Sequence, residues 1–400
     1  MGKWIFALAG IAACVVGGIS ANQGRVDLVK VSKAALDAPK VLEEGKKAGL
    51  LLDFDEVNKE FPIPPDDQNF AMVVPDVIRL CKDQLRFISK FVVKTPNAAE
   101  LERLETMKAG LDLAVKESNR TGFRSQKTYK RYGAYDSAFE IVSFCNAISY
   151  RALYRGQRGD IEGCLQDLRA SNRIGYLISL ESTNNSWRNA AAIIGNASEV
   201  AITLSANEFA KDPIKLERLQ RVVLESQSQF DVNRYIRLSC FAAMNSARNK
   251  IGFGEDESPQ TKKFIKNGLA PDARGRLEQY KRVKMFTKIQ SAWEDTGHDV
   301  VKFESKLKTL DVGIEVGMQS PGELFLSVTP AVNVMYEQRR ALANIEATKM
   351  TLKYGRWATL SEINGSFMID PRTGEKFEIT YSGNAPEFIK HEVSEAEFAK

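Results

Sequence analysis

Histidine is scarce in this chain of 400 residues, which contains only His298 and His391. A Ser-His-Asp or Cys-His catalytic arrangement would have to use one of these two side chains. The sequence also lacks a G-x-S-x-G motif, a phosphate-binding P-loop, a dinucleotide-binding fingerprint and an H-E-x-x-H zinc motif. No catalytic or cofactor-binding residue is therefore assigned, and a non-enzymatic role is favoured over an enzymatic one.

Paired cysteines are also missing, since none of the five cysteines belongs to a C-x-x-C motif. A zinc ribbon or a thioredoxin-type site therefore has no support in the sequence. Cys81, Cys145, Cys164 and Cys240 each stand at an apolar helix position, which predicts small buried side chains. A disulfide between Cys145 and Cys164 is the alternative if the protein works in an oxidising compartment.

The sequence has little excess charge of either sign, with 56 basic and 51 acidic residues and a net charge of +5. This excess is too weak over the whole chain to indicate a nucleic-acid partner, and none is expected. One segment departs from the balance, because Arg124 to Tyr135 interleaves four basic residues with three tyrosines. That composition is typical of a surface for nucleic acid or anionic lipid. We favour the alternative, a solvated connector whose tyrosines pack on the following helix.

Clusters of metal-ligating side chains are almost absent, and the one candidate is Glu294, Asp295, His298 and Asp299. Asp295 and His298 are three residues apart, which places them on one face of a helix. Gly297 weakens the helix at this point, and no second motif supplies the remaining ligands. We therefore predict a solvated helix end here, with no bound metal or other cofactor.

Charge is also absent between Lys3 and Arg25, and Trp4 to Ile19 is an unbroken run of apolar and small residues. A basic residue followed by such a run directs a chain to a membrane. This segment, residues 1–21, predicts that the protein is attached to or exported across a membrane and that its bulk lies outside the cytoplasm. Residues 22–35 are then expected to form a short tether.

Three fates remain open for the N-terminal segment. As an uncleaved anchor, which we favour, it would include the uncharged residues 20–24 to reach the roughly 20 residues that a spanning helix needs. Its many small residues also fit a signal peptide that is cleaved after Ala21. Finally, Ile11-Ala12-Ala13-Cys14 resembles a lipobox, the bacterial motif whose cysteine is lipidated.

Apolar residues recur at helical spacing along most of the remaining chain, so the sequence predicts a mainly helical protein. Thr95 is expected to cap one helix with Pro96 in its first turn, and Gly355 is expected to end the last helix. The polar stretches 117–135 and 252–276 are expected to be connectors, the second a long loop or lid. The predicted helices cover residues 77–92, 96–115, 137–155, 161–181, 187–206, 213–226, 231–251, 277–308 and 331–354.

Beyond Gly355 the pattern changes to short stretches rich in Phe, Ile, Thr and Tyr, at 366–369, 376–381 and 387–392. Asp370-Pro371-Arg372-Thr373-Gly374 stands between the first two, where proline pre-sets a turn dihedral and glycine supplies a positive φ. These residues predict a small antiparallel sheet, which is marginal alone and should pack on the last helix. The expected contacts on that helix are Val334, Leu342, Ile345 and Leu352.

The predicted fold is therefore mainly α, a bundle or array of helical hairpins with a small C-terminal antiparallel β element. Its divisions are the signal or anchor segment 1–21, the tether 22–35, a helical domain 36–323 and a C-terminal part 324–400. In the last division, the long helix precedes the β element.

Residues 148–171 resemble one degenerate tetratricopeptide repeat, with Gly159-Asp160 at the turn. Arg151 and Arg155 depart from the large residues preferred by that family, and no second copy follows at an offset of about 34 residues. The alternative, which we favour, is an ordinary antiparallel helix pair with Asp160 as the N-cap. The positions that carry the resemblance are Ala152, where two helices approach closely, and Cys164, Leu168 and Ser171 on the second helix.

Residues 330–383 resemble the C-terminal part of type II secretion pseudopilins, through Gly355-Arg356-Trp357, Leu360 and the Asp370–Gly374 motif. They also resemble the tails of membrane-anchored helical envelope proteins of unknown function from planctomycete-like bacteria, which is the better match. Pseudopilins carry an acidic residue in their N-terminal apolar helix, and this chain has none there. The envelope family implies membrane attachment and brings no activity with it.

These features predict a membrane-tethered, extracytoplasmic interaction or scaffold protein of the bacterial envelope, with the membrane and one or more proteins as partners. One alternative is a hydrolase that acts on an envelope polymer through two carboxylates about 5–10 Å apart. Another is a component of a secretion or pilus system. A deep cleft with two facing carboxylates would favour the hydrolase, and a shallow apolar groove would favour the scaffold.

Overall fold

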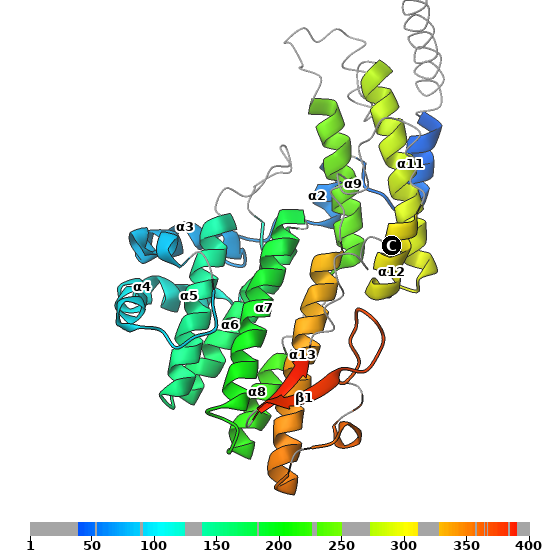
Figure 1. Cartoon of the computed structure of the whole chain (residues 1–400). Helices are drawn as coiled ribbons and strands as arrows, with labels where there is room; N and C mark the ends of the chain where they lie inside the picture. Colours follow the sequence, from blue (N-terminus) through cyan, green and yellow to red (C-terminus); the bar gives the residue numbers. More distant parts are fainter. Residues whose placement is uncertain are drawn as a thin grey trace, which may run out of the picture.

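The computed structural model shows a mainly helical protein, as the sequence predicts (Figure 1). Within the part of the chain that it describes, no helix is long and apolar enough to cross a membrane. The predicted segments 1–21 and 22–35 lie outside that part. The described residues are 39–52, 54–88, 91–124, 138–181, 184–225, 230–249, 273–310, 328–356, 358–363, 365, 367–382 and 385–389.

A first group of helices packs around its own apolar core (Figure 1). Phe70, Val77 and Leu111 are fully buried in this core, together with Phe144 and Ile174. The group consists of η1 (Phe70–Met72), α3 (Val74–Cys81), η2 (Lys82–Phe87), α4 (Ala98–Glu117), α5 (Ala138–Gln157) and α6 (Ile161–Ser179).

The helix predicted over 77–92 is shorter and changes type. It ends as an α-helix at Cys81 and continues as the 3₁₀ helix η2. The three-residue period of a 3₁₀ helix keeps Leu85 and Ile88 on the same side, and both are buried. The core therefore retains its apolar contacts with a tighter winding than the sequence pattern predicted.

The start of α4 also differs from the prediction, because its N-cap is Asn97 and not Thr95. The Asn97 side chain accepts a hydrogen bond from the Glu100 N–H at 3.0 Å, and the Glu100 carboxylate accepts one from the Asn97 N–H at 2.8 Å. This reciprocal capping box satisfies two donors that the helix end would otherwise leave unpaired. It places Pro96 just outside the helix.

A tight turn joins α5 to α6, as the sequence predicts. Gly159 has a φ of +82°, which only glycine adopts readily. The Asp160 side chain accepts from the Gly163 N–H at 3.0 Å and caps α6. The predicted helix pair with an aspartate N-cap is confirmed.

A buried ion cluster joins α4, α5 and α6. The Asp167 carboxylate is fully buried and accepts from Arg151 at 2.8 and 3.0 Å and from Arg155 at 3.0 Å. Arg151 also donates to Asp112 at 2.6 Å. Burial raises the pKa of Asp167, and the guanidinium of Arg151 acts against that rise. The two arginines of α5 therefore have a structural role, since they neutralise a carboxylate that is removed from water.

A second core lies between α7 (Asn184–Ala206), α8 (Pro213–Glu225) and α13 (Thr329–Tyr354), with further side chains from α5 and α6. Leu204 of α7 and Leu216 of α8 are fully buried in it. α13 ends at Gly355, which has a φ of +64° and confirms the predicted left-handed C-cap.

A third core contains α9 (Val232–Asn249), α11 (Ala273–Asp295), α12 (Val300–Thr309) and residues 39–52, which are helical from 39 to 47. In Figure 1, α9 and α11 lie side by side and extend beyond the ends of the other helices, with α2 (Phe54–Glu60) near the base of α9. Trp187 of α7 stacks on Tyr235 of α9 with 4.0 Å between ring centroids. This contact joins the third core to the rest of the protein.

The helix predicted over 277–308 is divided into α11 and α12. Gly297 and His298 between them have φ values of +60° and +65°. The Asp299 side chain then accepts from two N–H groups in the first turn of α12. Glycine stops the first helix and the aspartate cap starts the second. This confirms the helix end that Gly297 predicts at Glu294–Asp299, which the continuous apolar periodicity did not indicate.

The C-terminal segment folds back over α13 (Figure 1). β1 (Glu378–Ser382) and β2 (Ala385–Ile389) pair antiparallel, with Ile379 opposite Phe388. Upstream of them, Ile369 forms an isolated antiparallel bridge with Lys376, and Gly374 has the predicted positive φ, +74°. Residues 390–392 of the third predicted stretch lie outside the described residues.

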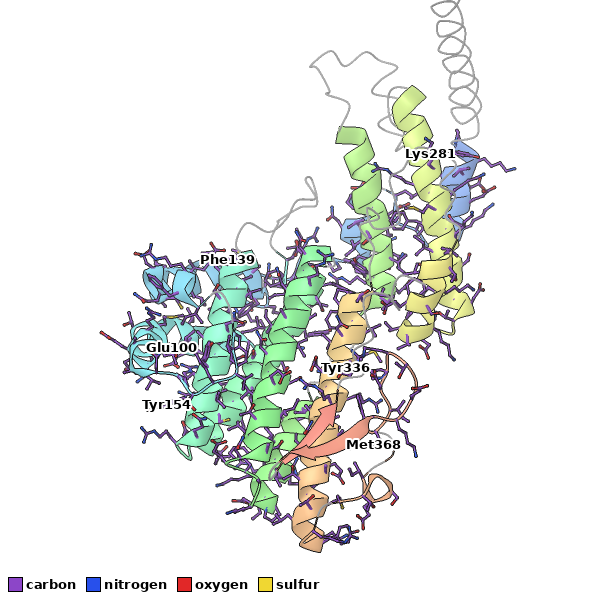
Figure 2. All side chains as sticks on the ribbon, in the orientation of Figure 1. Glu100, Phe139, Tyr154, Lys281, Tyr336 and Met368 are labelled. Atoms are coloured by element: carbon purple, nitrogen blue, oxygen red, sulfur yellow. The ribbon has the colours of Figure 1, made fainter. Side chains whose placement is uncertain are left out.

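The predicted contact face of α13 is only partly the observed one, because Leu342 and Ile345 belong to the core with α7 and α8, against which Phe367 is the part of the C-terminal segment that packs. Leu352 is exposed. Most of the C-terminal segment packs on another side of this helix, and Figure 2 shows Tyr336 and Met368 where the two meet. The contacts run from Tyr336, Ala343 and Ala347 to Ala358, Ile363, Met368 and Phe377.

The predicted boundary between residues 323 and 324 lies outside the described residues. Within them, α13 belongs to more than one core. Val328 and Ala331 pack with α9 and α11, whereas Leu342 packs with α7 and α8. The long helix therefore connects groups of helices that precede it in the chain.

Candidate functional site

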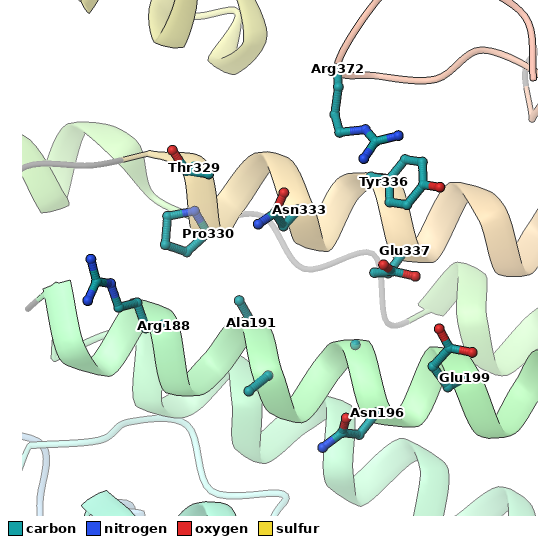
Figure 3. A pocket seen from close by; sticks show the side chains of 12 residues that line it. Arg188, Ala191, Asn196, Glu199, Thr329, Pro330, Asn333, Tyr336, Glu337 and Arg372 are labelled. Atoms are coloured by element: carbon teal, nitrogen blue, oxygen red, sulfur yellow. The ribbon is translucent and has the colours of Figure 1, made fainter. Parts of the chain in front are cut away.

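An open groove of about 670 Å³ runs between α7 and α13 (Figure 3). The two helices run in the same direction along it. Arg188 lies across from Pro330 at one end, and Glu199 lies near Glu337 at the other. Side chains of both helices therefore form two walls that face a shared space.

The α7 side of the groove is lined by residues with small side chains, which leave space between the two helices. Ala191, Ala192 and Gly195 line it at helical spacing. A Cβ placed on Gly195 would meet only the Cγ of Glu337, at 3.9 Å, which is ordinary van der Waals contact. A large side chain at residue 195 would therefore enter the groove without striking the backbone.

A guanidinium bridges the two carboxylates at one end of the groove. Arg340 donates to Glu337 at 2.8 and 3.0 Å, and it also contacts the Glu199 carboxylate. Burial and the charge of Arg372 lower the pKa of Arg340. The guanidinium therefore provides a counter-charge that both carboxylates share.

The C-terminal segment completes this end of the groove with Arg372 (Figure 3). Its guanidinium lies over the Tyr336 ring, 3.4 Å from the centroid, and donates to both oxygens of Asp370 at 2.8 to 3.2 Å. Burial raises the pKa of Tyr336, which therefore stays a neutral phenol at physiological pH. The cation–π contact and the ion pair fix the segment against the groove wall.

The opposite end of the groove is open and polar. Arg188 and Asn333 are exposed, and Arg188 forms no ion pair with another described residue. Asn196 is half-buried on the α7 wall and donates to Asn146 Oδ1 at 2.8 Å. An asparagine amide offers both a donor and an acceptor, so the two walls can bind the same kind of groups that a peptide backbone carries.

The predicted metal-ligand cluster is brought together only in part. His298 and Glu294 share a hydrogen bond of 2.8 Å, and both are exposed. Asp295 instead pairs with Lys306, and Asp299 caps α12. Among the described residues, no group of three or more His, Cys, Asp or Glu side chains is arranged to hold a metal ion. The second histidine, His391, lies outside the described residues.

The four described cysteines are free and buried, which confirms the predicted small buried side chains. Burial raises the pKa of Cys81 and of Cys164 to about 12, and raises those of Cys145 and Cys240 as well. Such thiols are protonated at neutral pH and lack the thiolate that nucleophilic catalysis needs. Cys14 of the lipobox-like motif lies outside the described residues.

The basic and aromatic segment 124–135 is described only at Arg124, which is buried. Its guanidinium donates to the Phe61 carbonyl and to Asn58 Oδ1, each at 2.8 Å. Its N–H donates to Asn69 Oδ1 at 2.9 Å. Arg124 is therefore a structural residue and not part of a surface patch, which was the alternative to the favoured solvated connector.

The groove residues were not identified from the sequence. The one local signal is the run of small side chains at Ala191, Ala192 and Gly195, which stand at i, i+1 and i+4 on α7. Such spacing marks a face on which something can approach the helix closely. It gives no information on which distant helix provides the second wall.

Comparison of the chain with models of known families, with curated proteins and with solved structures gave no match in any of the three. Its function therefore has to be inferred from the N-terminal sequence and from the geometry of the groove.

Proposed function

We propose that this chain is a membrane-tethered, extracytoplasmic interaction protein of the bacterial envelope, and that the groove between α7 and α13 binds a segment of a partner protein. The apolar N-terminal run supports the tether. The open groove of about 670 Å³ is the observation that carries the binding role. Its size is within the range of sites that hold small ligands or short peptide segments.

The chemistry of the walls favours a polypeptide over an apolar ligand. Asn333 offers an exposed neutral donor and acceptor, and Arg188 offers an exposed positive charge; beside them, the Asn196 amide donates to Asn146 and the Thr329 hydroxyl donates to Glu304. An extended peptide presents alternating N–H and C=O groups that such side chains bind. The groove is more polar than the shallow apolar groove that the scaffold prediction describes, so hydrogen bonding would contribute more than apolar burial to its specificity.

The site gives little support to the alternative function, a hydrolase that acts through two carboxylates. That chemistry needs one protonated and one ionised carboxyl group. Glu199 and Glu337 both pair with the same guanidinium, that of Arg340, so neither is set apart from the other as the acid. An interaction role fits the ion cluster better, because it keeps the groove wall rigid.

The architecture that we propose for this role is an array of antiparallel helical hairpins with a small C-terminal antiparallel β element. The Asp160-capped turn between α5 and α6 supports the hairpins. The pairing of β1 with β2 and the packing of Phe377 near Tyr336 support the β element. In this arrangement the C-terminal segment acts as a wall of the binding groove.

Filling the groove tests the proposed binding role. A photo-crosslinking amino acid at Asn333, in full-length protein in intact cells, should yield one discrete crosslinked partner. With that partner purified, Gly195→Trp should weaken binding at least about tenfold, because the indole would occupy the groove. Gly365→Trp is the matched control, since Gly365 is exposed and has no atom within 4 Å of an added Cβ. Equal affinity of both variants for the partner would contradict the proposal.

A further inference from the structure

The described guanidiniums at the groove between α7 and α13 differ in their partners. Those of Arg340 and Arg372 are each paired with carboxylates beside the groove. Arg188 is exposed and forms no ion pair with another described residue. Figure 3 shows its side chain reaching from α7 toward the start of α13. Among the described residues, the guanidinium of Arg188 is therefore the one at the groove that lacks a carboxylate.

The two ends of the groove differ in charge as a result. At the end away from Arg188, three carboxylates share two guanidiniums, which gives that end a formal excess of one negative charge. The opposite end has the unpaired guanidinium. The groups counted at the negative end are Glu199, Glu337 and Asp370 with Arg340 and Arg372.

The direction of the two helices adds to this difference. α7 begins at Asn184 and α13 at Thr329, so both walls have their N-termini at the end with Arg188 (Figure 3). The backbone dipoles of a helix sum to a partial positive charge at its N-terminus. Glu304 of α12 acts in the opposite sense, but its carboxylate accepts from the Thr329 hydroxyl at 2.8 Å and does not pair with Arg188.

The donors at this end match a carboxylate. The planar fork of an arginine donates two parallel hydrogen bonds to a carboxylate, and the exposed amide of Asn333 on the α13 wall can donate another. One guanidinium and one neutral amide balance a single negative charge. A phosphate group carries more charge and is usually bound by a cluster of arginines.

The length of the groove sets how a bound segment is placed. Glu199 follows Arg188 by eleven residues on α7, which is roughly 16 Å along the helix axis. An extended chain advances about 3.3 Å per residue, so about five residues cover that distance. A segment with a carboxylate at Arg188 would therefore place a residue about five positions away beside Glu199.

We propose that the groove selects an extended partner segment that has an aspartate or glutamate side chain, and that Arg188 and Asn333 bind this carboxylate. The inference rests on the proposed function and names the chemistry of the bound segment. It also assigns the orientation of the segment to Arg188. A reversed segment would place its carboxylate near Glu199, where negative charge is already in excess.

Peptide selection tests the proposed preference. The probe is a phage library of random peptides of about ten residues, displayed without a free C-terminus and captured on the purified full-length protein. Groove binders are the peptides whose capture is lost with Gly195→Trp. They should be enriched in Asp or Glu at one position, and selection on Arg188→Glu should instead enrich Lys or Arg there.

Arg221→Glu is the matched control for this selection. Arg221 of α8 is also exposed, forms no ion pair with another described residue and lies outside the lining of the groove. The variant carries the same charge change as Arg188→Glu and should retain the preference for an acidic residue. Loss of that preference in both variants would overturn the proposal, because the net charge of the protein would then account for it.

Affinity measurements test the contact directly. With one selected peptide made synthetically, Arg188→Gln should weaken binding at least about tenfold. Replacing the acidic residue of the peptide by its amide should weaken binding to a similar degree. The two changes together should cost no more than either alone, because both remove the same ion pair. Effects that multiply would overturn the proposal.

The outcomes separate this inference from the proposed function. Groove binders without an acidic preference, or with the same preference in Arg188→Glu, would overturn the inference and leave the binding role of the groove in place. A library without any peptide sensitive to Gly195→Trp would overturn both. Groove binders found only in a second library with free C-termini would overturn the inference in favour of recognition of a chain end.

Discussion

Gly110 and Gly195 have opposite surroundings although both lie within helices. A Cβ on Gly110 would be 2.6 Å from Cys81 Sγ and 2.9 Å from the Val77 carbonyl oxygen, whereas on Gly195 its nearest neighbour is 3.9 Å away. Gly195→Ala should therefore raise the free energy of unfolding by roughly 0.5–1 kcal/mol, because alanine loses less backbone entropy in a helix. Gly110→Ala should lower it by roughly 1–3 kcal/mol, because α3 must move. Urea unfolding of the two variants measures both changes in the free energy of unfolding. Changes of the same sign would contradict this account.

The buried Asp167 is the residue on which the ion cluster depends. Asp167→Ala should lower the free energy of unfolding by roughly 3–5 kcal/mol, because Arg151 and Arg155 would lose their common counter-charge in a buried site. Glu162→Ala is the control: its carboxylate also pairs with an arginine, Arg218, but is largely exposed, and its loss should change the value by less than about 1 kcal/mol. Chemical denaturation of both variants measures the two changes in the free energy of unfolding. Equal effects would mean that the cluster contributes no more than a surface ion pair.

Single residues were predictable where their role is local. Asp160 as an N-cap, Gly355 as a C-cap and Gly374 in its turn each follow from the neighbouring few residues. The pairing of Arg151 with Asp167 was not predictable, because it needs the packing of one helix on another. The same limit applies to Arg372, whose place in the groove depends on how the C-terminal segment crosses α13.

At the scale of elements, periodicity identified most helices, and competing local interactions moved their ends. Asn97 forms a capping box that Thr95 cannot form with Glu100. The contact face of α13 was missed because that helix is apolar on more than one side, so no single stripe marks its partner. The groove escaped prediction for a related reason: its walls, α7 and α13, are more than a hundred residues apart in the chain.

The short helix η5 (Leu360–Glu362) contains a cap whose strength depends on pH. Arg356 donates to the Glu362 carboxylate and the Thr359 N–H donates to it at 2.8 Å; together these contacts lower the pKa of Glu362 to about 2. The folded-state pKa lies below the ordinary value near 4.3, so the cap adds stability above that pH and loses it as the pH falls towards 2. NMR titration of the Glu362 carboxyl carbon should show a midpoint near 2. A midpoint at the ordinary value would contradict the cap, and Arg356→Gln should move the midpoint upward.

At the scale of the whole molecule, the N-terminal segment predicts the location. The protein should sediment with membranes after an alkaline wash, and a protease should reach its body only from outside the cytoplasmic membrane, because an uncleaved apolar run would hold it there. Fractionation of cells and protease treatment of spheroplasts measure this. A soluble cytoplasmic protein that retains residues 1–21 would refute the location, and a membrane-bound protein labelled by lipid would identify Cys14 as the attachment point.

The length of α13 has a mechanical consequence. Its 26 residues make a rod of roughly 39 Å. The rod is clamped near its first turn by α9 and α11, along its middle by α7 and α8, and on another side by the C-terminal segment. A rigid bar held at three places transmits a tilt from one end to the other instead of bending. A substitution that shifts its first turn would therefore also displace Asn333 and Glu337, which line the groove further along the same helix.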